Sequence, residues 1–107
     1  MDEETRHFTE LLSCIGPVQA RRMFGGTGFF LEGRMFALAA DGCLYLKTDA
    51  RSRTAFTARG LQPFRYRRRG RLVALGYHAA PAEALDDPEA MRPWAERAWT
   101  AARRSRG

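Results

Sequence analysis

The sequence predicts one α+β domain, covering residues 1–107, in which helices pack on one face of an antiparallel sheet of five strands. Its 107 residues are one domain's length, and 45% of them are apolar, as in ordinary globular proteins. Apolar residues recur at helical spacing near both ends of the chain. Between these ends, short apolar runs alternate with glycine-containing turns. The expected element order is αβββαββα, in two layers.

The first helix is expected over residues 2–14. Four apolar residues follow helical i, i+3, i+4 and i+7 spacing: Phe8, Leu11, Leu12 and Ile15. Acidic residues in the first turn suit the positive end of the helix dipole. Gly16-Pro17 should end the helix.

Three strands in a meander are expected next, over residues 29–31, 34–39 and 43–47. Glu32-Gly33 and Asp41-Gly42 separate these apolar runs. Dipeptides of this kind are strong signals for two-residue hairpin turns, so neighbouring strands should pair antiparallel.

A short helix is expected over residues 50–59, capped by Thr48 or Asp49 and ended by Gly60. Two more strands, over residues 64–68 and 71–77, should be joined at Arg69-Gly70. With a two-residue turn, strand alternation separates two faces of this hairpin. The predicted core face holds Phe64, Tyr66, Val73, Leu75 and Tyr77, and the predicted basic face holds Arg65, Arg67 and His78.

The last helix is expected from Asp87-Pro88 to about Arg104, after a helical turn over residues 81–85. Asp87 is a suitable N-cap, and proline is favoured at the first helical position. One helical stripe is apolar: Met91, Trp94, Ala95, Ala98, Trp99 and Ala102.

The charge distribution favours an anionic partner. Lys and Arg number 18 against 12 Asp and Glu, for a net charge of +6. Residues 61–80 hold five of the arginines and no acidic residue. We expect contacts to nucleic acid or to an acidic protein at Arg65, Arg67, Arg68, Arg69 and Arg71, with Arg21 and Arg22 as a second choice. The alternative is a solvated strand surface whose charges deter aggregation.

The sequence shows no catalytic constellation, and an enzyme is not expected. The segment Gly25-Gly26-Thr27-Gly28 lacks the GK[ST] ending of a phosphate loop and leads into a strand. The two cysteines, Cys14 and Cys43, lie far apart with no CxxC spacing, so the sequence gives no support for a metal site at either one. No apolar run is long enough to span a membrane. We therefore expect a cytoplasmic protein without cofactor, metal or membrane contact.

An ordered set of motifs is similar to the N-terminal domain of TfoX/Sxy proteins, over roughly residues 10–103. The matching residues are Arg22-Met23-Phe24-Gly25-Gly26-x-Gly28, Gly33-x-Met35-Phe36-Ala37-Leu38, Leu44-Tyr45-Leu46-Lys47, Gly60-Leu61-x-Pro63-Phe64-x-Tyr66, Gly70, Tyr77, Pro81, Leu85-x-Asp87 and Trp94. The resemblance implies a two-layer αβββαββα fold like that of secretion chaperones. It also implies a role in competence gene regulation, through a transcription factor of the cyclic-AMP receptor protein type or through DNA.

The resemblance carries no catalytic residues. Its motif positions are interpreted as core and backbone-geometry positions: Met23, Phe24, Gly25, Gly26, Gly28, Tyr45, Lys47 and Trp94. The family's regulators have a second, C-terminal domain, and these 107 residues correspond to the first. A different hypothesis is a chaperone-like or dimeric scaffold that binds a peptide at an apolar surface or strand edge. Monomer and homodimer fit the sequence equally well.

Overall fold

The computed structural model describes residues 2–23 and 25–105, and the side chains of residues 72–75 are outside this description. Along the chain the elements are α1 (Glu3–Leu12), η1 (Ser13–Ile15), β1 (Gln19–Met23), β2 (Gly26–Leu31), β3 (Arg34–Ala40), β4 (Cys43–Lys47), α2 (Arg53–Thr57), β5 (Pro63–Arg68), β6 (Arg71–Ala79), η2 (Ala82–Leu85) and α3 (Pro88–Arg104). The elements η1 and η2 are short 3₁₀ helices.

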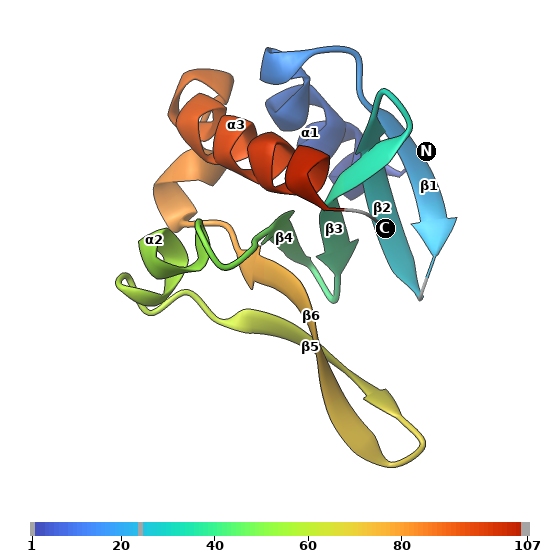
Figure 1. Cartoon of the computed structure of the whole chain (residues 1–107). Coiled ribbons are helices and arrows are strands. Elements are labelled where there is room, and N and C mark those ends of the chain that lie inside the picture. Colours follow the sequence, from blue (N-terminus) through green and yellow to red (C-terminus); the bar gives the residue numbers. More distant parts are fainter. Residues whose placement is uncertain (1, 24, 106–107) are drawn as a thin grey trace.

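The described residues form one antiparallel sheet of six strands in the order β1-β2-β3-β4-β6-β5. Helices α1 and α3 lie over one face of its β1–β4 part, and the β5–β6 hairpin extends away from them (Figure 1). The predicted α+β class and two-layer arrangement are therefore confirmed. The predicted number of five strands is corrected to six.

The additional strand is β1, which precedes the predicted meander and pairs with β2 along its whole length. Gly25 lies in the turn between the two strands with a φ of 73°, a left-handed conformation that glycine adopts without strain. The meander turns follow the prediction. Glu32-Gly33 and Asp41-Gly42 both combine φ values of 51° and 80°, as type I′ hairpin turns require.

The helix ends follow from their capping residues. Asp2 accepts a 2.7 Å hydrogen bond from the backbone N–H of Thr5, and Asp87 accepts one of 2.8 Å from Ala90. The predicted helix over residues 2–14 is α1 followed by the 3₁₀ turn η1. The helix predicted over residues 50–59 is shorter, because α2 begins at Arg53 and ends at Thr57.

The main core lies between the sheet and the helices. Its largest fully buried side chains include Phe29, Phe36 and Phe56, and the ring of Phe36 meets that of Trp99 edge-on at 6.1 Å. A smaller apolar cluster is separate from this core. It consists of Leu38, Phe64 and Tyr77, with Met35, Ala40, Tyr45 and Tyr66 packed against them.

Within the described residues, α3 and the other helices are all too short or too polar to cross a lipid bilayer.

Candidate nucleic-acid interface

The β5–β6 hairpin is a twisted two-stranded ribbon that extends beyond the rest of the sheet (Figure 1). Arg69 and Gly70 form its turn with φ values of 51° and 78°, which confirms the predicted two-residue connection. Its base joins the body of the sheet where β6 pairs with β4, at Tyr45↔Ala79, Leu46↔His78 and Lys47↔Tyr77. The outer part of the hairpin is thus held mainly by its own ladder.

The structure brings five predicted contact residues together on this ribbon, and all five are exposed: Arg65, Arg67, Arg68, Arg69 and Arg71. Arg68 lies directly opposite Arg71 in the ladder, an arrangement in which like charges repel. Arg67 donates a 3.4 Å hydrogen bond from Nη1 to the carbonyl of Gly70. Among the residues that the structure describes, no carboxylate forms an ion pair with any of the five. The ribbon therefore carries uncompensated positive charge.

The predicted separation of aromatic and basic residues holds for the described side chains of β5. Phe64 is buried and Tyr66 half-buried in the smaller apolar cluster, whereas Arg65 and Arg67 are exposed. The aromatic residues do not join the main core, however, because that core lies under the helices. Val73 and Leu75, which were predicted on the same face, have side chains outside the described part of the structure.

His78 is buried, unlike the two arginines predicted on the same face of the hairpin. Its side chain is buried at the base of the hairpin, with Nδ1 3.0 Å from the hydroxyl of Thr48 and the ring 5.7 Å from that of Phe56. Burial lowers the pKa of the imidazole, and the nearby cations of Arg53 and Arg65 lower it further. His78 is thus a neutral packing residue at neutral pH.

The second-choice residues, Arg21 and Arg22, lie on β1 at the opposite edge of the sheet from β5. The guanidinium of Arg21 lies 4.9 Å from the centre of the Phe30 ring. Arg22 lines a shallow hollow together with Asp2, so its charge has an acidic neighbour. These two arginines form a surface separate from the hairpin.

The glycine-rich motif forms the β1–β2 turn and the start of β2. A Cβ added to Gly26 would lie 2.2 Å from the carbonyl oxygen of Ala39, so β3 approaches too closely for any side chain. A Cβ on Gly28 would lie 2.6 Å from the sulfurs of both Met23 and Met35. Phe24 lies outside the described residues. The segment joins two strands and does not open a helix, unlike a phosphate loop.

The other motif residues lie on different surfaces. Tyr45 packs edge-on against Phe64, with ring centres 5.0 Å apart. The Nζ of Lys47 lies 5.1 Å from the centre of the Tyr77 ring. Trp94 packs against Phe56, and the guanidinium groups of Arg59 and Arg97 lie 5.3 Å and 4.7 Å from the centre of its ring.

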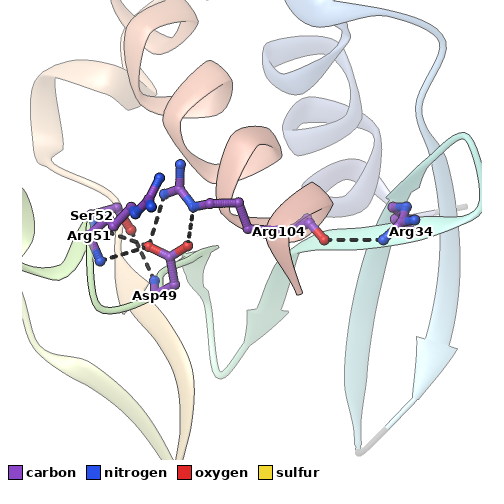
Figure 2. Close-up of polar contacts among 6 residues, drawn as sticks. Arg34, Asp49, Arg51, Ser52 and Arg104 are labelled. Carbon is purple, nitrogen blue, oxygen red and sulfur yellow. Dashed lines mark hydrogen bonds and ion pairs between the residues drawn. The ribbon is translucent and has the colours of Figure 1, made fainter. Parts of the chain in front are cut away.

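A polar network that the sequence analysis did not find fixes the end of α3 (Figure 2). The carboxylate of Asp49 accepts two hydrogen bonds from Arg104, of 2.6 and 3.0 Å, and backbone N–H bonds from Arg51 and Ser52. The hydrogen bond from Arg104, more than any other contact, holds the pKa of Asp49 well below its usual value. Arg34 donates to the Ala102 carbonyl at 3.4 Å and thereby ties β3 to the same helix end.

Comparison with known proteins settles the family. The TfoX N-terminal domain family matches residues 10–102, which is most of the chain. The chain belongs to the TfoX N-terminal domain family. One similar protein is the DNA transformation protein TfoX1 of Aliivibrio fischeri (strain ATCC 700601 / ES114), 29% identical over 77 residues. That match covers 72% of this chain and 37% of the relative, so this chain spans well under half of the relative's length.

Proposed function

We propose that this TfoX-type domain is a non-catalytic regulatory adaptor that binds the phosphate backbone of duplex DNA through its β5–β6 hairpin. The observation that carries the proposal is the set of five exposed arginines without an ion-paired carboxylate among the described residues. Arginine binds phosphate oxygens well because its planar guanidinium can donate two parallel hydrogen bonds.

The composition of the hairpin supports this function over a merely solvated surface. A surface that only keeps a protein soluble usually mixes both signs of charge. Residues 61–80 contain five arginines and no acidic residue, and two of these arginines, Arg68 and Arg71, are paired across the ladder. An anionic partner would relieve that repulsion.

The shape of the hairpin also supports contact with duplex DNA. The major groove is wide enough to admit a two-stranded β-ribbon, and other DNA-binding proteins use such ribbons. The β5–β6 ribbon extends from the body, so its tip can approach a duplex without contact from α1 or α3 (Figure 1).

The biological setting comes from the family. The relative in Aliivibrio fischeri is named a DNA transformation protein. We extend that setting to this chain and propose that it regulates competence genes, acting on DNA beside a transcription factor of the cyclic-AMP receptor protein type. In this scheme the hairpin contacts phosphates next to the bound transcription factor, in the cytoplasm.

The proposal is tested by titrating labelled random duplex DNA and reading fluorescence anisotropy at several salt concentrations. The variant R65Q/R67Q/R69N removes three charges and places Asn-Gly in the turn, which type I′ geometry favours. The plot of log K against log salt has a negative slope. We expect the variant's slope to be shallower by about 2.7, or roughly 0.9 for each lost phosphate contact.

A matched control removes three exposed arginines elsewhere, in R6Q/R51Q/R53Q, and leaves the hairpin intact. Both triple variants have the same net charge. Equal losses of DNA affinity in the two variants would mean that affinity depends on net charge and not on the position of the hairpin arginines. That result would contradict the proposal. Adding the transcription factor to the same titration shows whether the two proteins bind DNA cooperatively.

A second candidate function is peptide binding or dimerisation on the smaller apolar cluster. Met35, Tyr45 and Tyr66 are only half-buried there, and β1 lies at the edge of the described sheet, beside β2. Such binding would respond weakly to salt, because it buries apolar surface and forms few ion pairs. Salt-insensitive binding of a peptide, with no binding of DNA, would favour this function.

A further inference from the structure

A hollow of about 530 Å³ lies where the end of β2, the start of β3, the end of β4, the inner part of β6 and the end of α3 meet. None of the hairpin arginines lines it. Its principal lining residues are Phe30, Arg34, Met35, Lys47, Tyr77 and Ser105. The volume is within the range of pockets that hold small organic ligands.

Among the residues that the structure describes, the hollow is lined by the cations of Lys47 and Arg34 and by no acidic side chain. The ammonium group of Lys47 lies over the Tyr77 ring at 5.1 Å and beside Gly76, which has no side chain to cover it. Arg34 donates from Nη1 to carbonyls at the end of α3, the shorter contact being 3.2 Å to Ser105. Within the described part of the chain, neither Lys47 nor Arg34 forms an ion pair.

Phe30, Met35 and Tyr77 add an apolar and aromatic wall to this polar lining. Phe30 and Met35 are both half-buried and lie opposite each other in the β2–β3 ladder, so each exposes part of its side chain. The Tyr77 hydroxyl donates to the Met35 carbonyl at 3.5 Å, and burial raises the pKa of Tyr77 to about 12. The phenol is therefore neutral at physiological pH and adds no negative charge to the hollow.

We propose that this hollow binds a small organic anion with a flat aromatic group, of about the size of a mononucleotide. The anionic group of such a ligand would lie at Lys47 and Arg34, and its ring would contact Phe30 and Met35. An inorganic anion would use the cations alone and leave the apolar wall exposed to water. The same chemistry is offered by a free nucleotide and by the terminal nucleotide of a nucleic-acid strand.

The test is a titration followed by two-dimensional amide NMR, with 2-naphthoate, guanosine 5′-monophosphate and inorganic phosphate as separate probes. We expect saturable binding of an aromatic anion, with the shifted amides gathered around residues 30–35, 47 and 77. Phosphate should bind much more weakly. Absence of saturable binding of both aromatic probes at roughly millimolar concentration, where even weak specific ligands bind, would overturn the proposal.

Matched variants assign the effect to the hollow. Lys47→Gln should weaken aromatic-anion binding by about tenfold, the loss expected for one partly exposed charge-assisted contact. Phe30→Leu should weaken the binding of the aromatic probes and leave the binding of phosphate unchanged. Arg67→Gln removes an equal charge from the hairpin and should have no effect. Wild-type affinity in the Lys47→Gln protein would contradict the proposal.

Two further arms identify the source of the ligand and separate this inference from the DNA proposal. Tighter binding of a short 5′-phosphorylated single strand than of the mononucleotide, lost in Lys47→Gln, would indicate a strand terminus. Tighter binding of the mononucleotide would indicate a free metabolite. We expect R65Q/R67Q/R69N to retain aromatic-anion binding and Lys47→Gln to retain most duplex DNA binding, so either proposal can fail alone.

Discussion

The β1–β4 meander and the β5–β6 hairpin belong to the same sheet, but their side chains have different surroundings. In the meander, one face packs against α1 and α3 and supplies fully buried residues such as Phe29 and Phe36. In the hairpin, β5 holds two partly or fully buried aromatic residues, and its arginines are exposed. The meander buries apolar surface, and the hairpin exposes charge.

We expect this difference to separate the stability of the fold from the proposed binding. Burial of large apolar side chains is the main stabilising contribution to folding, and surface charges contribute little. A change in the meander should therefore affect unfolding. A change near the tip of the hairpin should affect binding while the fold persists.

The largest effect is expected for Phe36→Ala in the meander. Phe36 is fully buried and its ring meets that of Trp99, so truncation leaves a cavity and should cost about 3–5 kcal/mol of unfolding free energy. Urea denaturation followed by tryptophan fluorescence measures it. Arg67→Ala on the hairpin is the comparison and should change stability by no more than about 0.5 kcal/mol. Similar losses of unfolding free energy in the two variants would contradict the idea that the meander stabilises the fold more than the hairpin does.

A smaller effect is expected for Asp49→Asn, which removes the ion pair with Arg104. The pKa of Asp49 is lowered from its usual 3.8, so ionised Asp49 stabilises the folded state above that pH. Water screens this partly exposed pair, so the loss should be about 1 kcal/mol or less near pH 7. The difference between wild type and variant should shrink as the pH falls below about 4, as the carboxylate takes up its proton. Urea titrations at several pH values measure this, and a difference independent of pH would assign the effect to packing.

The smallest effect has the opposite sign and is expected for Arg68→Glu. The substitution replaces a repulsive cross-strand pair with an attractive one opposite Arg71, which should stabilise the hairpin by about 0.2–0.5 kcal/mol. The same change should weaken DNA binding, because it reverses one charge of the proposed interface. Thermal unfolding and anisotropy of a single preparation measure both effects. If the variant is less stable than wild type and binds DNA equally well, both expectations for the hairpin are wrong.

Local signals were sufficient to predict most elements of the fold from the sequence. Asp87-Pro88 and the apolar stripe place α3, and Asp41-Gly42 and Arg69-Gly70 place two hairpin turns. Strand β1 was missed because Gln19–Met23 is an edge strand without a regular apolar alternation, and its residues are exposed or half-buried. The candidate arginines of the hairpin lie within a few residues of one another in the sequence, so the local net charge was enough to predict them as a group.

Features that depend on distant contacts could not be predicted. The partition of β5 into aromatic and basic residues follows from alternation, but alternation does not show which sheet face the helices cover. His78 is buried because Thr48 and Phe56 happen to lie beside it in the fold. The bond between Asp49 and Arg104 joins residues 55 positions apart. The hollow at Lys47 likewise forms only when residues of five elements, β2, β3, β4, β6 and α3, come together.

The strand order β4-β6-β5 has a consequence for the order of events during folding. Neighbouring strands of the meander, and β5 with β6, are linked by short turns, so each of these pairings closes only a small loop. The pairing of β4 with β6, which we call the β4–β6 seam, instead brings together residues such as Thr48 and His78. These residues are 30 positions apart, so the pairing must close a much longer loop. We expect this seam to form after the folding transition state. Substitutions along it would then mainly accelerate unfolding, so the hairpin would be the part of the sheet that detaches first.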